Sequence, residues 1–137
     1  MKFRKTVAGF SLIELMIALA VISILASIAY PNYMEYLQRA RRAECASVLL
    51  GQANAMERRF STTNSYVGAL PGPVQCPADG GPSSYVLGFA EDEPTALTFV
   101  IQAVPAGAQT GDRCGTLSID NTGLKTQASG MTTRQCW

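Results

Sequence analysis

The chain has 137 residues, a formal net charge of +1 and 47% hydrophobic residues, so it has room for one modest domain besides any membrane segment. It contains no histidine, which excludes catalysis by an imidazole base, including Ser-His-Asp and Cys-His systems. Its four cysteines lack the Cys-x-x-Cys spacing typical of zinc sites. An even cysteine number beside a membrane-targeting segment favours disulfides in an oxidising compartment.

A basic leader precedes a long apolar segment. Lys2, Arg4 and Lys5 form a basic patch in the leader, and Glu14 is the only charged residue between positions 10 and 30. A helix of that length measures about 30 Å, the thickness of a bilayer's hydrocarbon core. The basic leader predicts a cytoplasmic N-terminus, with the rest of the chain on the outer side.

Glu14 is unusual in this segment. A carboxylate inside a membrane-spanning helix costs about 2.5–3.5 kcal/mol on insertion scales. The sequence therefore favours a partner or a specific role for Glu14, and the alternative is that Glu14 lies near the membrane interface, reaches toward the headgroups and has no role.

An amphipathic helix is expected over residues 32–61, after a break or kink at Pro31. Its predicted apolar face consists of Leu37, Ala40, Cys45, Val48, Leu49, Met56 and Phe60. Its predicted polar face carries Glu35, Arg39, Arg41, Arg42, Glu57 and Arg58. The basic stretch 39–44 has three interpretations: a solvated helix face with ion pairs between helices, a charge cluster near lipid headgroups, or a nucleic-acid contact. Three arginines alone bind nucleic acid weakly at physiological salt.

The second half of the chain predicts a sheet. A turn-rich loop covers residues 61–83, with a short strand near residues 66–67. Alternating apolar residues then predict strands in "SYVLGFA", "TALTFVIQAV" and "RCGTLSID", and "LKTQ" is a short fourth strand. The inward residues are expected to be Tyr85, Leu87, Phe89, Leu97, Phe99, Ile101, Ala103, Leu117 and Ile119. A helix and a sheet that each bury one face give a two-layer α+β domain.

The stretch "GFSLIEL" with its basic leader resembles the class III signal of the type IV pilin family, as found in type IVa prepilins. In that family a prepilin peptidase cuts after the glycine, here Gly9, and methylates the new N-terminal residue, here Phe10. The acid at the position of Glu14 is implicated in subunit assembly. Pro31 and the residues after it also resemble pilins, so the resemblance is strong from about residue 5 to 66 and looser beyond.

The resemblance implies a pilin fold, in which a long N-terminal helix packs on an antiparallel sheet of about four strands. It divides the chain into a leader peptide (1–9), a transmembrane and filament-core helix (10–31) and a head (32–137). The compact head looks most like PilE-like minor pilins. The expected location is the inner membrane, with a single pass and a periplasmic head, and afterwards a surface pilus. The expected partners are the prepilin peptidase, other pilin subunits, the inner-membrane assembly platform and the membrane itself.

The cysteines add a prediction that depends on the resemblance. A Cys114–Cys136 bond resembles the disulfide-bounded C-terminal region of many type IV pilins, which leaves Cys45 and Cys76 as the second pair. Four cysteines allow three connectivities, and the sequence leaves all three open.

The leading function is a structural pilus subunit, with two alternatives. One is a pseudopilin of a type II secretion system, which shares the N-terminal signal. The other is a pilin that binds DNA for uptake, which the charge count disfavours: from Phe60 onward there are three basic residues and six acidic ones. An enzyme is the least favoured class, and no cofactor is expected.

A metal site is not expected either. The stretch around Asp112, Asp120 and Asn121 suggests calcium ligands, but it lacks the acid density of an EF-hand loop. The acidic run 91–93 is interpreted as a solvated turn.

Overall fold

The computed structural model describes residues 9–137, so the basic leader residues Lys2, Arg4 and Lys5 lie outside the described part. The chain divides into two compact units, residues 1–36 and residues 37–137. The expected boundary after residue 31 falls within the first unit. Helix α1 (Leu12–Thr63) contributes to both units.

Helix α1 begins and ends with recognisable local signals. The Ser11 hydroxyl accepts a hydrogen bond from the Glu14 backbone N–H at 3.3 Å, as an N-cap side chain does. After Thr63, Asn64 adopts a left-handed conformation (φ 53°), and its N–H donates to the Phe60 carbonyl at 2.7 Å. Asparagine is one of the few residues that tolerates this helix-ending conformation.

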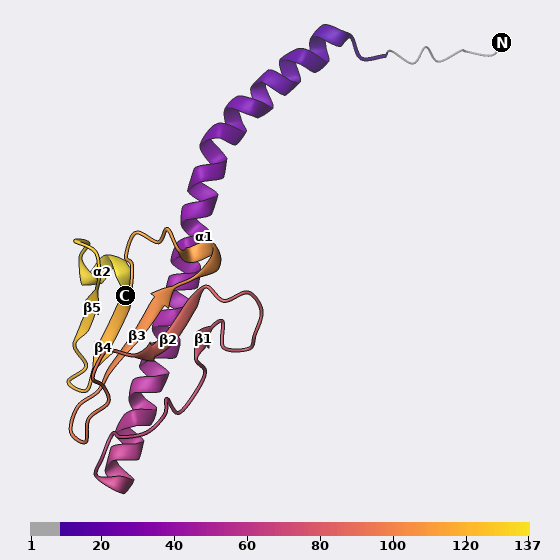
Figure 1. Ribbon diagram of the computed structural model, residues 1–137. Coiled ribbons are helices and arrows are strands. Elements are labelled where there is room, and N and C mark those ends of the chain that lie inside the picture. Colours follow the sequence, from indigo (N-terminus) through magenta and orange to yellow (C-terminus); the bar gives the residue numbers. More distant parts are fainter. Residues whose placement is uncertain (1–8) are drawn as a thin grey trace, which may run out of the picture. The chain divides into compact units, whose positions relative to one another are not determined.

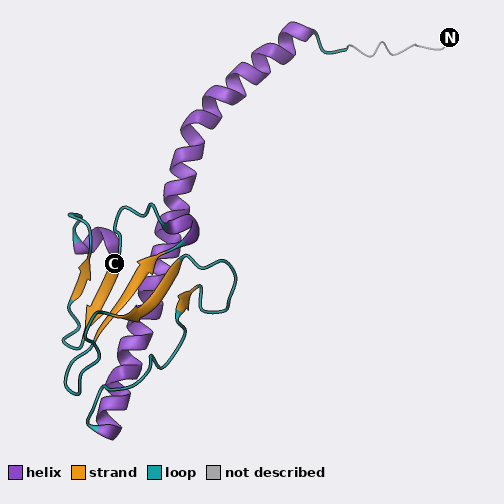
Figure 2. Cartoon of the chain, viewed as in Figure 1, coloured by secondary structure: helices purple, strands orange, loops and turns teal. Residues whose placement is uncertain are grey.

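The second unit contains a five-stranded antiparallel sheet in the order β1-β2-β3-β4-β5. Its elements are β1 (Gln75–Cys76), β2 (Tyr85–Phe89), β3 (Val100–Pro105), β4 (Leu117–Asp120), β5 (Lys125–Gln127), the 3-10 helix η1 (Gly107–Gln109) and helix α2 (Thr133–Cys136). The strands lie side by side against the C-terminal part of α1 (Figures 1 and 2). The predicted α+β architecture with a long helix on an antiparallel sheet is confirmed.

The strand count differs slightly from the prediction of about four. The additional strand is β1, whose Gln75 pairs with Val86. The expected strand near residues 66–67 is wrong: Tyr66 is buried, and its ring stacks on Phe60 with centroids 4.5 Å apart. The Tyr66 ring, its N–H bond to the Ala96 carbonyl and its hydroxyl bond to Glu57 therefore hold this segment without strand pairing.

The core of the second unit lies between α1 and the inner face of the sheet. It includes Leu49 and Met56 from the helix and Tyr85, Ile101 and Leu117 from the strands. Leu97 was predicted to point inward, but it is 68% exposed because β3 begins only at Val100. The strand predicted over residues 95–104 thus begins five residues too early, within a loop.

Two disulfides join distant parts of the second unit. Cys45 of α1 is bonded to Cys76 of β1, and Cys114 is bonded to Cys136 at the end of α2. This is the connectivity that the resemblance favoured among the three. The first bond fixes the sheet edge to the helix, and the second closes the C-terminal segment.

Candidate functional site

The predicted processing residues lie at the N-terminal end of the described chain. Phe10 is 81% exposed, and a side chain at Gly9 would meet open space. Glu14 lies in the first turn of α1, where the helix dipole favours a negative charge. The structure thus presents Gly9 and Phe10 just before the helix, with Glu14 one turn inside it.

The helix after this motif is apolar and exposed. Every large apolar residue from Phe10 to Ile28 is at least half exposed, and Leu12–Thr63 includes a window long and apolar enough to cross a membrane, by length and composition. Such a surface is stable only when lipid or other apolar helices cover it. This part of the chain therefore needs partners outside itself.

Pro31 lies inside α1 rather than at its end. Because proline lacks an N–H, it cannot donate to the backbone ladder. The Asn32 side chain adds a hydrogen bond to the Ile28 carbonyl at 3.0 Å, next to the missing donor. The helical assignment continues through Pro31, and a kink there remains a prediction.

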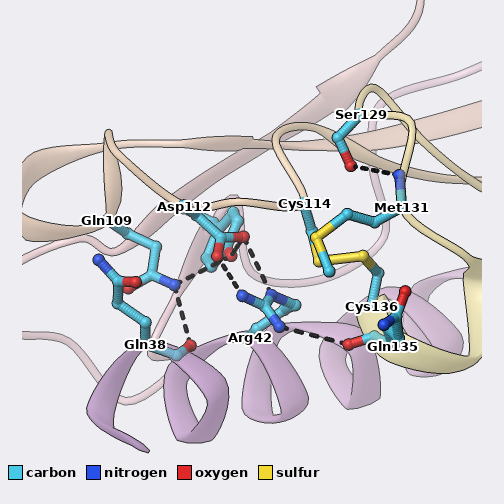
Figure 3. Close-up of polar contacts among 10 residues, drawn as sticks. Gln38, Arg42, Gln109, Asp112, Cys114, Ser129, Met131, Gln135 and Cys136 are labelled. Carbon is cyan, nitrogen blue, oxygen red and sulfur yellow. Dashed lines mark hydrogen bonds and ion pairs between the residues drawn. A yellow bond between two sulfur atoms is a disulfide. The ribbon is translucent and has the colours of Figure 1, made fainter. Parts of the chain in front are cut away.

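The most connected polar cluster of the second unit centres on Arg42 (Figure 3). Its guanidinium donates to both carboxylate oxygens of Asp112, with Nε 3.0 Å from Oδ2, and to the Gln135 carbonyl at 3.4 Å. The Tyr85 hydroxyl donates to the same carboxylate at 2.7 Å. Gln109 joins the cluster by donating to the Tyr85 hydroxyl at 3.2 Å, and it also donates to the Gln38 carbonyl at 2.9 Å.

The charges of this cluster are removed from solvent. Arg42 is 7% exposed and Asp112 is 8% exposed. The hydrogen-bonded Asp112 carboxylate raises the pKa of Arg42, despite the opposing effect of burial. Burial, and then the hydrogen bond to Asp112, raise the pKa of Tyr85 far above its ordinary value. Both groups therefore keep their protons throughout the neutral range.

The assignment of Arg42 to the polar face of the helix was wrong. Arg42 precedes Cys45 by three residues, Leu49 by seven and Met56 by fourteen, so it lies on the buried stripe. That spacing indicates a buried position, but the charge of Arg42 indicates a solvated one, because its partner Asp112 is 70 residues away in the sequence. Ala40 shows the opposite error: it was placed on the apolar face and is exposed.

The three suggested calcium ligands do not form one site. Asp112 is engaged by Arg42 and Tyr85, whereas the Asp120 carboxylate accepts hydrogen bonds within the β4–β5 turn, from Thr122 and Leu124. Across residues 9–137, no group of three or more acidic, cysteine or histidine side chains is placed to hold a metal ion. Asp112 is thus a structural partner of the helix.

An exposed apolar helix behind a processing motif, followed by a helix-and-sheet head with a C-terminal disulfide, is the architecture of a type IV pilin. Residues 4–30 match the family model of the prokaryotic N-terminal methylation motif. Residues 31–118 match the family model of the type IV minor pilin ComP, DNA uptake sequence receptor. The chain belongs to this minor pilin family, which is not a class of enzymes.

Individual relatives agree with this assignment. The fimbrial protein EcpC of Eikenella corrodens is 45% identical over 53 residues, which is 39% of this chain and 35% of EcpC. The chain thus spans about a third of the length of the curated relatives it matches first.

Two solved structures share the fold. The non-core minor pilin PilV of Neisseria meningitidis matches with a TM-score of 0.53 and 18% identity, covering 74% of this chain and 94% of PilV. A type IV pilin from Shewanella oneidensis matches with a TM-score of 0.50 and 28% identity, covering 73% of this chain and 97% of that pilin.

Proposed function

We propose that this chain is a minor subunit of a type IV pilus, held in the inner membrane and then assembled into a filament. The observation that carries this proposal is the match of residues 4–30 to the methylation motif, together with the exposure of every large apolar side chain from Phe10 to Ile28 within that stretch. The relatives described above are pilus subunits, which favours a pilus over a type II secretion pseudopilus.

Processing and assembly are coupled in this proposal through Glu14. Cleavage after Gly9 frees an amine at Phe10, which is a cation in an apolar layer. A buried charge is costly alone but tolerable when it is paired with an opposite charge. We place the Glu14 carboxylate of one subunit against the Phe10 amine of a neighbour, so that the partner charge exists only after the leader is removed.

A Glu14→Ala variant tests this coupling. We expect normal membrane insertion and normal cleavage, because neither the apolar length nor Gly9 is changed, but reduced recovery in sheared surface filaments. Immunoblots of the membrane and filament fractions measure the effect, and Glu44→Ala, in the second unit, is the control. Wild-type recovery of the Glu14 variant in filaments would refute the pairing.

DNA binding for uptake is the second candidate function. The match to a family described as a DNA uptake sequence receptor favours it, against the simple charge count. The distribution of charges supports it as well. Asp112 is neutralised by Arg42, and three of the remaining acids lie together in the β2–β3 loop, at residues 91–93. The Cys114–Cys136 bond brings the segments of Arg113 and Arg134 together elsewhere on the head.

Retardation of DNA by the full chain in detergent tests this candidate. We expect Arg134→Glu to weaken retardation and to reduce its salt dependence, because one phosphate contact is replaced by a repulsive charge. Lys125→Glu and Glu91→Gln are the comparison variants, the second of which leaves every cation in place. Equal retardation by wild type and Arg134→Glu at every salt concentration would count against a DNA contact at this segment.

A further inference from the structure

Three tyrosines lie on helix α1 directly after its apolar run. Tyr30, Tyr33 and Tyr36 belong to the first unit and follow one another at intervals of three residues. On an α-helix this spacing keeps three side chains within about a third of the circumference. The tyrosines are 67%, 59% and 68% exposed, so residues 9–137 leave most of this surface uncovered. We call these three residues the tyrosine face.

The other polar side chains of residues 15–34 hydrogen bond to the helix itself. Ser23, Ser27 and Asn32 each donate to a backbone carbonyl three or four residues earlier, at 2.8, 2.7 and 3.0 Å respectively. Such bonds satisfy a polar side chain where no water is present. A tyrosine ring instead holds its hydroxyl away from the helix backbone, so the hydroxyl finds its partner outside the helix. After Glu14, the tyrosine face is therefore the first place where the helix directs polar groups into its surroundings.

The position of the tyrosine face along α1 matches the edge of a bilayer. At about 1.5 Å per residue, Tyr30 lies about 30 Å beyond Phe10, which is the thickness of the hydrocarbon core. Tyr33 and Tyr36 follow about 4.5 and 9 Å further on. The polar headgroup layer adds roughly 5–8 Å on each side of the core. The backbones of Tyr30 and Tyr33 therefore lie at the depth of this layer, and that of Tyr36 lies slightly beyond it.

The direction of the side chains brings all three rings to that layer. Side chains on an α-helix lean toward its N-terminus and cover the turn before their own Cα atoms. Because the apolar run precedes the tyrosines, their rings lean toward the hydrocarbon, and the ring of Tyr36 recovers the distance by which its backbone lies outside. A tyrosine has an apolar ring and a polar hydroxyl, and it is enriched at membrane–water interfaces. A lipid headgroup layer thus fits the tyrosine face better than water or hydrocarbon alone.

We propose that the tyrosine face binds the lipid headgroup layer on the outer side of the inner membrane and so fixes the depth of helix α1 before assembly. The inference rests on the proposed pilus function, which places this helix in that membrane with the second unit outside. Because Phe10 lies about one hydrocarbon thickness away, the same anchor holds the Gly9–Phe10 bond at the opposite surface of the membrane.

Depth-dependent fluorescence quenching of the full chain tests this contact. Y33W is reconstituted at a high lipid excess in vesicles of phosphatidylethanolamine and phosphatidylglycerol, so that neighbouring copies are rare. Part of the lipid carries bromine either near the headgroup or at the far end of the acyl chains, and bromine quenches tryptophan only at close approach. The signal of the native Trp137, measured on the unsubstituted chain, is subtracted.

The matched control is I22W, because Ile22 lies midway along the apolar run and has a similar exposure of 60%. We expect bromine near the headgroups to quench Y33W severalfold more than bromine at the chain ends, and the reverse order for I22W. The same order of quenching in both variants would overturn the proposal. The absence of quenching of Y33W by either lipid would also overturn it, because water or another protein helix would then surround the tyrosine face.

Replacement of the whole tyrosine face tests whether it fixes the depth of the helix. The reporter is A29C, one residue before the face, which is treated in spheroplasts with a membrane-impermeant maleimide. The four native cysteines are paired in disulfides and do not react. We expect Y30A/Y33A/Y36A to increase the labelling severalfold, whereas Y30W/Y33W/Y36W keeps it low, because tryptophan prefers the same layer. Equal labelling of the three chains, or equally high labelling of both triple variants, would contradict the anchor.

The failure of this inference can be told apart from the failure of the pilus function. If the unsubstituted chain is recovered in sheared surface filaments but the expected order of quenching is absent, the lipid contact is wrong and the pilus function stands. If the order of quenching is as expected but the chain is absent from filaments, the pilus function is wrong and the lipid contact stands.

Discussion

Ile22 and Leu49 lie on the same helix, yet Ile22 is 60% exposed and Leu49 is fully buried. In the second unit, the sheet covers the helix stripe that carries Leu49, and the Cys45–Cys76 disulfide and the buried Arg42–Asp112 ion pair hold it there. In the first unit no described part of the chain covers the apolar surface. One continuous helix thus contributes to an internal core in its second half and presents a surface for partners in its first half.

Removal of Arg42 should have the largest effect on the second unit. Arg42→Ala leaves the Asp112 carboxylate buried without its cation, which typically costs about 3–5 kcal/mol of unfolding free energy. Thermal unfolding and protease resistance of the full chain in detergent measure the loss. Arg41→Ala should be nearly neutral, and Arg42→Met combined with Asp112→Leu should recover much of the loss. A wild-type melting temperature for Arg42→Ala would show that the cluster is not structural.

Truncation of matched apolar residues tests the comparison directly. Leu49→Ala should destabilise the second unit by about 2–5 kcal/mol, because it opens a cavity in a packed core. Ile22→Ala should leave that unit's unfolding unchanged, since Ile22 contributes to no internal core, while it weakens filament recovery. If Ile22→Ala lowered the melting temperature as much as Leu49→Ala, the division into two kinds of apolar surface would be wrong.

Loss of the C-terminal disulfide should have a comparable or slightly smaller effect. The bond between Cys114 and Cys136 closes a segment with a sequence separation of 22. Replacing both by serine should cost about 3 kcal/mol in the chain-entropy account, because the unfolded chain regains freedom. The same unfolding assay measures it, and non-reducing peptide mapping checks that Cys45–Cys76 remains. No change in stability would mean that the Arg42 cluster alone holds this segment.

The smallest expected effect is a loss of stability of the β4–β5 turn at acid pH. The pKa of Asp120 is lowered, because hydrogen bonds from Thr122 and Leu124 outweigh the opposing effect of burial. A lowered folded-state pKa gives stability that is present above the ordinary value of 3.8 and is lost as pH falls through the lower folded value. We expect amide exchange at Leu124 to accelerate in that range, and Asp120→Asn to remove the pH dependence. An identical acid profile in both proteins would exclude this role.

Much of the architecture could be predicted from the sequence, because it depends on local patterns. The apolar run, the alternation of Tyr85 and Leu87, and the turn after Asp120 each specify their structure within a few residues. The interior position of Arg42 could not be predicted, since it depends on a carboxylate that only the folded topology brings near. The exposure of Leu97 could not be predicted, because the alternation of apolar residues begins in the loop before the strand. In that loop Leu97 N–H donates to the Thr95 hydroxyl and the Thr98 hydroxyl donates to Glu93, without strand pairing.

The candidate site divides in the same way. The predicted roles of Gly9, Phe10 and Glu14 follow from a short motif and its spacing. The pairing of the four cysteines could be predicted only through the family resemblance, or else seen in the structure. The charge distribution on the head could be read only from the structure, because the number of charged residues does not say where they lie. As a sum the acids disfavour DNA binding, but Asp112 is neutralised by Arg42 and residues 91–93 lie together in one loop.

In the proposed function, processing turns an exposed membrane helix into a filament-core helix. Mass spectrometry of the chain from sheared surface filaments is the decisive measurement. We expect a chain that begins at Phe10 and carries one methyl group on its N-terminal amine. A chain in filaments that still begins with its leader, or a processed chain confined to the membrane of piliated cells, would refute the link between processing and assembly.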